Sequence, residues 1–192
     1  HVRSRRQRQM CIRDRDETGL RPLPKKKKVW APKGARRSHA KGNECRFSLT
    51  CLMTIFADGT SMPPFFIVKG KKYSPPWFHD PVLVAALRSA GQVRAGLTVQ
   101  GNAWMDTPIF LKWIEESFLP HTSSKRSAKT PLLLLMDNFG AHINHEVIRK
   151  LVDNHVKVVT LPPHSSHLLQ ALDVGIMLPF KKHMDNALAA YK

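Results

Sequence analysis

Residues 132–143 read "LLLLMDNFGAHI", an apolar run that ends abruptly on an aspartate. Such a run is typical of a strand covered on both faces in a parallel sheet. Helical spacing follows over 144–155 and a second buried strand is expected over 156–163. Strand, helix and strand predict a βαβ unit with parallel strands and a right-handed crossover. Ligands bind beyond the carboxyl ends of such strands, and Asp137 lies at that end.

Two more aspartates are expected at the same edge of the sheet. Asp173 lies near the start of a terminal helix that should begin near Leu169, and Asp16 should end a first strand whose beginning is missing. Three converging carboxylates repel one another unless a cation compensates them. Hard oxygen ligands favour Mg²⁺ or Mn²⁺ over zinc. Two simpler roles remain open: an Asx turn for Asp137 and a favourable first-turn charge for Asp173.

The rest of the chain predicts an α/β fold. Segments 45–59 and 62–70 are expected to form an antiparallel meander that turns at Asp58-Gly59. Residues 104–121 have helical spacing, with Asp106 or Thr107 as the cap. Pro179 should kink or break the terminal helix, and residues 71–103 show no clear pattern. A mixed sheet flanked by helices follows.

Composition narrows the function. The 192 residues, 42% of them hydrophobic, suffice for one domain, and the net charge of +17 favours a polyanionic partner, DNA or RNA first. No apolar stretch approaches the roughly 20 residues of a membrane helix, so no membrane partner is expected. The start shows no secretory pattern. Three cysteines without framework spacing favour a reducing compartment.

Residues 5–14, "RRQRQMCIRD", resemble the in-frame translation of a sequencing-library adapter. We therefore interpret residues 1–15 as an adapter-derived segment and exclude them from the fold prediction. The alternative is a genuine basic tail. Without this segment the chain is still strongly basic, and residues 16–192 form the predicted domain, incomplete at its N-terminus.

Four segments carry a specific resemblance: "DETGL" (16–20), "ADGTSMPPFFIVKGK" (57–71), "MDNFGAH" (136–142) and "LPPHSSHLLQALDVGIMLPFK" (161–181). Together they resemble the catalytic domain of pogo/Tigger/jerky-type DDE transposases, which are related to centromere protein B. The resemblance implies a ribonuclease-H-like fold and a carboxylate triad at Asp16, Asp137 and Asp173. The spacing agrees, since 35 residues separate the last two aspartates.

The resemblance also implies a reaction. Its chemistry is two-metal phosphoryl transfer with Mg²⁺ or Mn²⁺, which cuts and joins DNA at transposon ends. Family members are expected to act as homo-oligomers on DNA in the nucleus. Asn138 and His142, in the loop after the strand, are candidate second-layer or DNA contacts. The alternative function is a domesticated or inactive transposase-derived nuclear DNA-binding protein.

Three weaker signals stay open. The run Lys25, Lys26, Lys27 and Lys28 resembles a nuclear import signal, but could form a solvated turn or contact phosphates. The pairs His142/His145 and His164/His167 have H-x-x-H spacing without a zinc-protease helix pattern, so carboxylates explain the sheet edge better than zinc. Trp30, Trp77 and Trp104 could stack on unpaired bases or pack into the core.

Overall fold

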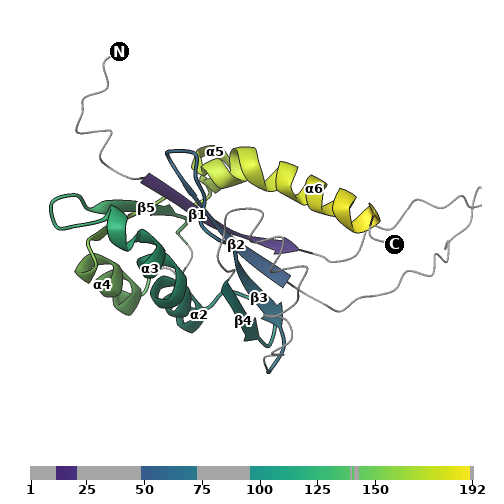
Figure 1. The fold of residues 1–192 in the computed structure, drawn as a ribbon, viewed down its shortest axis with the longest axis horizontal. Coiled ribbons are helices and arrows are strands. Elements are labelled where there is room, and N and C mark those ends of the chain that lie inside the picture. Colours follow the sequence, from purple (N-terminus) through teal and green to yellow (C-terminus); the bar gives the residue numbers. More distant parts are fainter. Residues whose placement is uncertain (1–11, 21–48, 73–95, 139, 141–142, 191–192) are drawn as a thin grey trace, which may run out of the picture.

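A computed structural model describes residues 12–20, 49–72, 96–138, 140 and 143–190 of the chain. These residues form a six-stranded sheet in the order β4-β3-β2-β1-β5-β6 (Figure 1). The strands are β1 (Ile12–Leu20), β2 (Leu49–Phe56), β3 (Phe65–Lys69), β4 (Gly96–Gln100), β5 (Leu132–Met136) and β6 (Val156–Thr160).

The topology confirms the predicted mixed sheet. Strands β1, β2 and β3 form an antiparallel meander, and its tight turn has the left-handed Gly59 that the Asp58-Gly59 signal predicts. Strands β5 and β6 are parallel and are joined through α4, as expected for a βαβ unit. Strand β4, from the stretch without a clear pattern, adds parallel to β3 at one edge.

Strand β1 corrects two sequence predictions. It begins at Ile12, so residues 12–15 belong to the sheet although the adapter interpretation had excluded them. Asp16 consequently lies in the middle of the strand, opposite Met53 of β2, and not at its end. The exclusion failed because an extended chain of any origin can donate and accept ladder hydrogen bonds between two strands. Asp16 is therefore paired with β2, while the pairing of β1 with β5 ends at Asp14.

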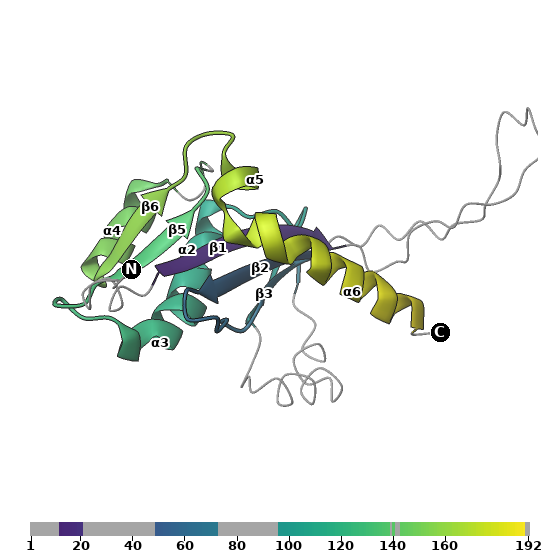
Figure 2. The same cartoon turned by 90° about the horizontal axis from the view of Figure 1, so that it is seen from above.

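The helices cover both faces of the sheet (Figures 1 and 2). The helices α2, α3 and α4 lie on one face, and α5 and α6 lie on the other. Alternate residues of β1 show this division, because Arg15 faces Phe110 of α2 while Asp14 contacts Leu172. The helical segments are α2 (Thr107–Trp113), a π-helical turn η2 (Ile114–Phe118), α3 (Leu119–Thr122), a 3₁₀ turn η3 (Ser123–Lys125), α4 (His145–Asp153), α5 (Ser166–Leu169), a π-helical turn η4 (Leu172–Ile176) and α6 (Met177–Ala190).

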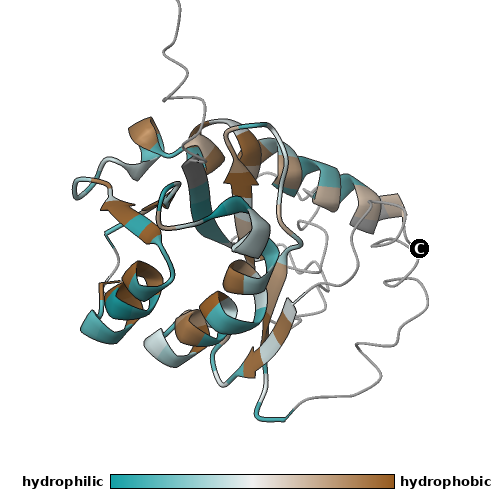
Figure 3. Cartoon of the chain, turned by 60° about the vertical axis from the view of Figure 1, so that its left-hand side comes forward, coloured by the Kyte–Doolittle hydropathy of each residue, from teal (hydrophilic) through white to brown (hydrophobic). Residues whose placement is uncertain are grey.

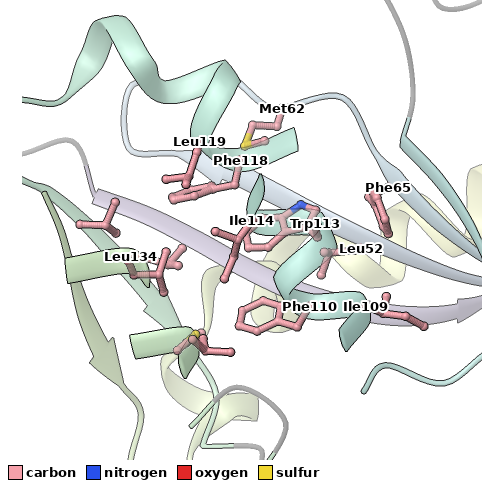
Figure 4. Packing of buried hydrophobic residues seen from close by; sticks show 14 of the residues in the cluster. Leu52, Met62, Phe65, Ile109, Phe110, Trp113, Ile114, Phe118, Leu119 and Leu134 are labelled. Atoms are coloured by element: carbon pink, nitrogen blue, oxygen red, sulfur yellow. The ribbon is translucent and has the colours of Figure 1, made fainter. Parts of the chain in front are cut away.

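The apolar core lies between the sheet and the helices α2 to α4 (Figure 4). Side chains from one helical stretch project onto the sheet and meet Leu52 and Leu134 there. The Asp106 carboxylate accepts a hydrogen bond from the Ile109 N–H and caps α2 as predicted. The fully buried side chains of this stretch are Phe110, Trp113, Ile114 and Phe118.

Two strands are less buried than their apolar sequences predict. In β5 burial alternates, so Leu133 and Leu135 are only half-buried. Strand β6 was expected to be buried, but only Val156 is, because β6 is the last strand of the sheet and lacks a second neighbour. An apolar sequence therefore did not distinguish a central strand from an edge strand.

The predicted break of the terminal helix at Pro179 is absent, because η4 continues into α6 through Met177, whose backbone is helical. The chain leaves helical geometry at Gln170, between α5 and η4, and Pro179 then lies in the first turn of α6. Helix α6 carries alternating apolar and polar bands (Figure 3).

Candidate active site

The register of β1 and β5 brings two of the predicted aspartates to the same level of the sheet. The two strands are parallel, with Asp14 beside Leu135. Continued by two residues, this register sets Asp16 beside Asp137, the first residue after β5. Adjacent strands are about 4.8 Å apart. Asp16 is buried and Asp137 is half-buried.

The third aspartate comes from the helical side of the same face. Asp173 is exposed and lies in the first turn of η4, which packs against β1. Its carboxyl group is close enough to that of Asp16 for its charge to raise the pKa of Asp16. The fold thus brings Asp173 to Asp16 although 156 positions separate them in the sequence.

Two hydrogen bonds hold η4 against β1. The Gln170 side chain is fully buried, and its Nε2 donates to the carbonyl oxygen of Arg15 at 2.8 Å. The Leu172 N–H donates to Asp14 Oδ2 at 2.7 Å. Arg15, in the first bond, directly precedes Asp16, and Leu172, in the second, directly precedes Asp173. The two bonds therefore set the position of one carboxylate relative to the other.

Burial and a neighbouring charge perturb the Asp16 carboxyl group. Removal from water, followed by repulsion from Asp173, raises the pKa of Asp16 to about 8. The backbone N–H of Glu17 donates to Asp16 Oδ1 at 2.8 Å and opposes this rise. Burial also raises the pKa of Asp14, with a smaller contribution from Asp173. This face of the sheet therefore disfavours accumulated negative charge.

Arg15 points to the opposite face of β1. It is fully buried, pairs with Glu17, and its guanidinium lies 4.4 Å from the centre of the Phe110 ring and 5.6 Å from that of Trp113. A guanidinium over aromatic faces keeps part of its electrostatic stabilisation after leaving water. The charge of Arg15 is thereby satisfied within the core and does not compensate the aspartates on the other face.

The donor set fits a hard divalent cation. Carboxylate oxygens are the ligands that Mg²⁺ and Mn²⁺ prefer, and a cation would remove the repulsion that raises the pKa of Asp16. Within the described part of the chain, no group of three His, Cys, Asp or Glu side chains is close enough to hold a metal ion. The carboxyl groups of Asp16 and Asp173 are thus close enough to interact. Asp137, directly after β5, does not complete a group of three metal ligands with them.

The other predicted site residues have mixed outcomes. Asn138 is exposed directly after Asp137. His142 and the run Lys25 to Lys28 lie outside the described residues, as do Trp30 and Trp77. His145, His164 and His167 are exposed, and no metal cluster among described residues includes them.

Sequence reasoning missed Gln170 and Asp14. Gln170 interrupts the apolar spacing of "HLLQALD", a signal that could have marked a buried polar contact. Asp14 lay within the excluded adapter segment and was not considered.

Comparison with known sequences agrees with this architecture. Residues 47–191 match the family described as DDE superfamily endonuclease. The chain belongs to this family. The match begins just before β2, so Asp16 lies outside the matched range although it is in the same sheet.

Named relatives extend the similarity over most of the chain. The Jerky protein of Mus musculus is 31% identical over 185 residues, which cover 92% of this chain and 30% of that protein. A Cochliobolus lunatus protein named MFS-type transporter clz9 is 28% identical over 142 residues, which cover 72% of this chain and 14% of that protein. The chain therefore spans less than a third of these relatives. Among its described helices, none has the length and apolar character to cross a membrane.

A solved structure confirms the ribonuclease-H-like fold. The structure titled Mos1 transposase paired-end complex with left transposon end aligns with a TM-score of 0.53 at 12% identity. The alignment covers 90% of this chain and 41% of that chain. At this identity the likeness concerns the fold, which is a mixed sheet with helices on both faces.

Proposed function

We infer that this DDE superfamily endonuclease domain is the catalytic core of a transposase that cuts and joins DNA strands with divalent metal ions. The observation that supports the inference is the proximity of the Asp16 and Asp173 carboxyl groups on the face where the β1–β5 register, continued by two residues, leads to Asp137. A binding protein gains nothing from clustering carboxylates on a surface meant for a polyanion, because the charges repel. A metal-dependent nuclease needs them.

The roles of the residues follow from their positions. Asp16, Asp137 and Asp173 would hold two Mg²⁺ or Mn²⁺ ions, which lower the pKa of an attacking water or 3′-hydroxyl and neutralise charge on the leaving oxygen. The mid-strand position of Asp16 gives it a rigid base. Gln170 and Asp14 keep η4, and with it Asp173, against β1. The exposed Asn138 beside Asp137 is available to contact DNA.

Further parts of the proposal rest on the basic composition and the family. The net charge of +17 supports DNA as the substrate. The Mos1 structure is titled as a complex with a transposon end, which supports transposon ends as the DNA bound. Nuclear localisation and a homo-oligomer on DNA complete the proposal, with the lysine run at 25–28 as the import signal.

The test is metal-dependent nicking of supercoiled plasmid by the purified chain. Wild type should nick in Mg²⁺ or Mn²⁺ and not in EDTA, and Asp137→Ala should abolish nicking. Asp153→Ala is the matched control, because Asp153 is an exposed aspartate at the end of α4 paired only with surface Arg149 within the described contacts. Equal nicking by Asp137→Ala and wild type would refute the assignment.

A domesticated DNA-binding protein, the second candidate, predicts a different pattern. Plasmid would be bound but not nicked in any metal, and Asp137→Ala would bind as wild type does. Metal binding measured by calorimetry separates the cases further, since a working site takes up Mn²⁺ and loses this uptake in Asp16→Ala.

A further inference from the structure

Trp104 is a large apolar side chain exposed at the carboxyl edge of the sheet. Its exposed fraction is 68%, whereas Trp113 is buried in the core. It lies in the turn between β4 and α2, after the last residue of β4, Gln100. The sequence left stacking and core packing open for Trp104, and the structure excludes core packing. Its ring is therefore accessible to a partner from solution.

The turn that presents Trp104 is held by side-chain hydrogen bonds. Asn102 Oδ1 accepts from the Trp104 N–H at 3.0 Å, and Gln100 Oε1 accepts from the Asn102 N–H at 2.8 Å. The Thr50 hydroxyl of β2 donates to the Ala103 carbonyl at 2.8 Å. Ala103 has a φ of 62°, a left-handed conformation that costs energy in a non-glycine residue. These hydrogen bonds, together with the buried Ala103, fix the backbone that carries the exposed Trp104.

Lysines adjoin this turn. The carbonyl oxygen of Gln100 accepts both from the Ala103 N–H at 3.1 Å and from the Gly70 N–H at 3.0 Å, so the turns after β3 and β4 meet at one atom. Lys69, Lys71 and Lys72 flank Gly70, and all three are exposed. Three exposed lysines therefore belong to the turn that meets the turn of Trp104.

We propose that Trp104 with Lys69, Lys71 and Lys72 forms a binding platform for a single DNA strand, on which Trp104 stacks against an unpaired base and the lysines contact its phosphates. The proposal rests on the proposed function, because it names the form of DNA that the domain holds beside its cutting site. An aromatic face beside a basic groove is the general means of binding single strands without reading sequence. A duplex hides its base faces, so the indole discriminates single strands from duplex.

The platform is separate from the aspartates but belongs to the same sheet. Strand β4 is three strands from β1, or about 14 Å at the usual strand spacing. Parallel pairing of β3 with β4, and the antiparallel meander from β1 to β3, point the ends of β1, β4 and β5 to one edge. The pairings set Val99 of β4 level with Leu20, four residues beyond Asp16, which adds about 13 Å along the strands. A freed strand of several nucleotides is therefore needed to reach from Asp16 to Trp104.

The experiment measures binding of a fluorescein-labelled 20-nucleotide oligo-dT and of a duplex of equal length, both in EDTA so that cleavage plays no part. Trp104→Ala should weaken single-strand binding about tenfold and change duplex binding little. Trp104→Phe should restore most of the affinity because a phenyl ring also stacks. Val152→Ala, which truncates another exposed apolar residue on α4, should bind as wild type does.

The lysines are tested by salt dependence. The double variant Lys71→Ala/Lys72→Ala should reduce the slope of log affinity against log salt by about 1.4, since each of the two single-strand phosphate contacts contributes about 0.7. Lys157→Ala, on the opposite edge of the sheet in β6, should leave the slope unchanged. Binding is measured in EDTA, independently of cleavage, so loss of nicking in an active-site variant does not bear on the platform.

Two results would overturn the proposal. If Trp104→Ala weakened single-strand and duplex binding equally, the surface would be a general phosphate contact without stacking. If no variant changed oligonucleotide binding, this turn would have no part in binding DNA.

Discussion

The two faces of the sheet are built on opposite principles. The face under α2, α3 and α4 buries a continuous apolar cluster, and its one buried charge, Arg15, is paired with Glu17 and aromatic rings. The face under η4 and α6 buries Asp14, Asp16 and Thr18 of the same strand. Alternation along β1 separates the two sets, so one strand contributes to both stability and chemistry. The apolar face therefore stabilises the fold, whereas ionisation of the buried carboxyl groups on the other face destabilises it.

The largest expected effect is on the apolar face. Trp113→Ala should lower the free energy of unfolding by about 3–5 kcal/mol, because it empties a fully buried site stacked on Phe110. Urea denaturation followed by circular dichroism measures this. Leu178→Ala, at an exposed residue of α6, is the control and should change stability by less than about 0.5 kcal/mol. Equal effects would contradict the location of the core.

On the polar face, removal of a charge should stabilise the protein. The pKa of Asp16 is raised from 3.8 to about 8, so its contribution to stability is greatest below pH 4 and is lost as the pH rises toward 8. Asp16→Asn cannot ionise, and in EDTA at pH 8 it should gain on the order of 1–3 kcal/mol over wild type.

The gain from Asp16→Asn should shrink at pH 5, where the wild-type carboxyl is mostly protonated. Denaturation midpoints at both pH values, with Asp153→Asn as an exposed control, measure it. A gain that does not depend on pH would show that ionisation of Asp16 is not what strains this face. Added Mn²⁺ should stabilise wild type and not Asp16→Asn.

Gln170, which precedes η4, is connected to the backbone of β1 by one buried hydrogen bond. Gln170→Leu should lower the free energy of unfolding by about 1–3 kcal/mol, since it leaves the buried Arg15 carbonyl without its donor. It should also weaken Mn²⁺ binding, because Asp173 is no longer held beside Asp16. Calorimetric titration checks the second effect, and Gln170→Glu is not a suitable control because it adds charge. Unchanged metal affinity with lowered stability would limit Gln170 to a structural role.

The smallest effect concerns Cys51, which lies on the polar face opposite Thr18. Burial raises the pKa of its thiol to about 12, so the native protein should not react there with a thiol reagent at pH 8. In a variant with Cys11 and Cys45 changed to serine, labelling should appear only with denaturant. Fast labelling of the native protein would show that water reaches this face freely.

The sequence by itself determined the features that depend only on residues close together along the chain. The Asp58-Gly59 turn, the Asp106 cap and the βαβ unit around Asp137 were all predicted, because turns, caps and periodicity act over a few residues. The family motifs predicted the three aspartates; in the structure the charge of Asp173 raises the pKa of Asp16, and Asp137 directly follows β5.

Only the tertiary structure decided how distant segments meet. Apolar content did not reveal that β6 is an edge strand, that β4 pairs parallel to β3, or that Trp104 is exposed. Nor did it show Gln170 bonded to Arg15, since these residues are distant in the sequence. Periodicity defines which residues share a face, but only packing decides what covers that face, and this is why Asp16 became a strained, central residue rather than the end of a strand.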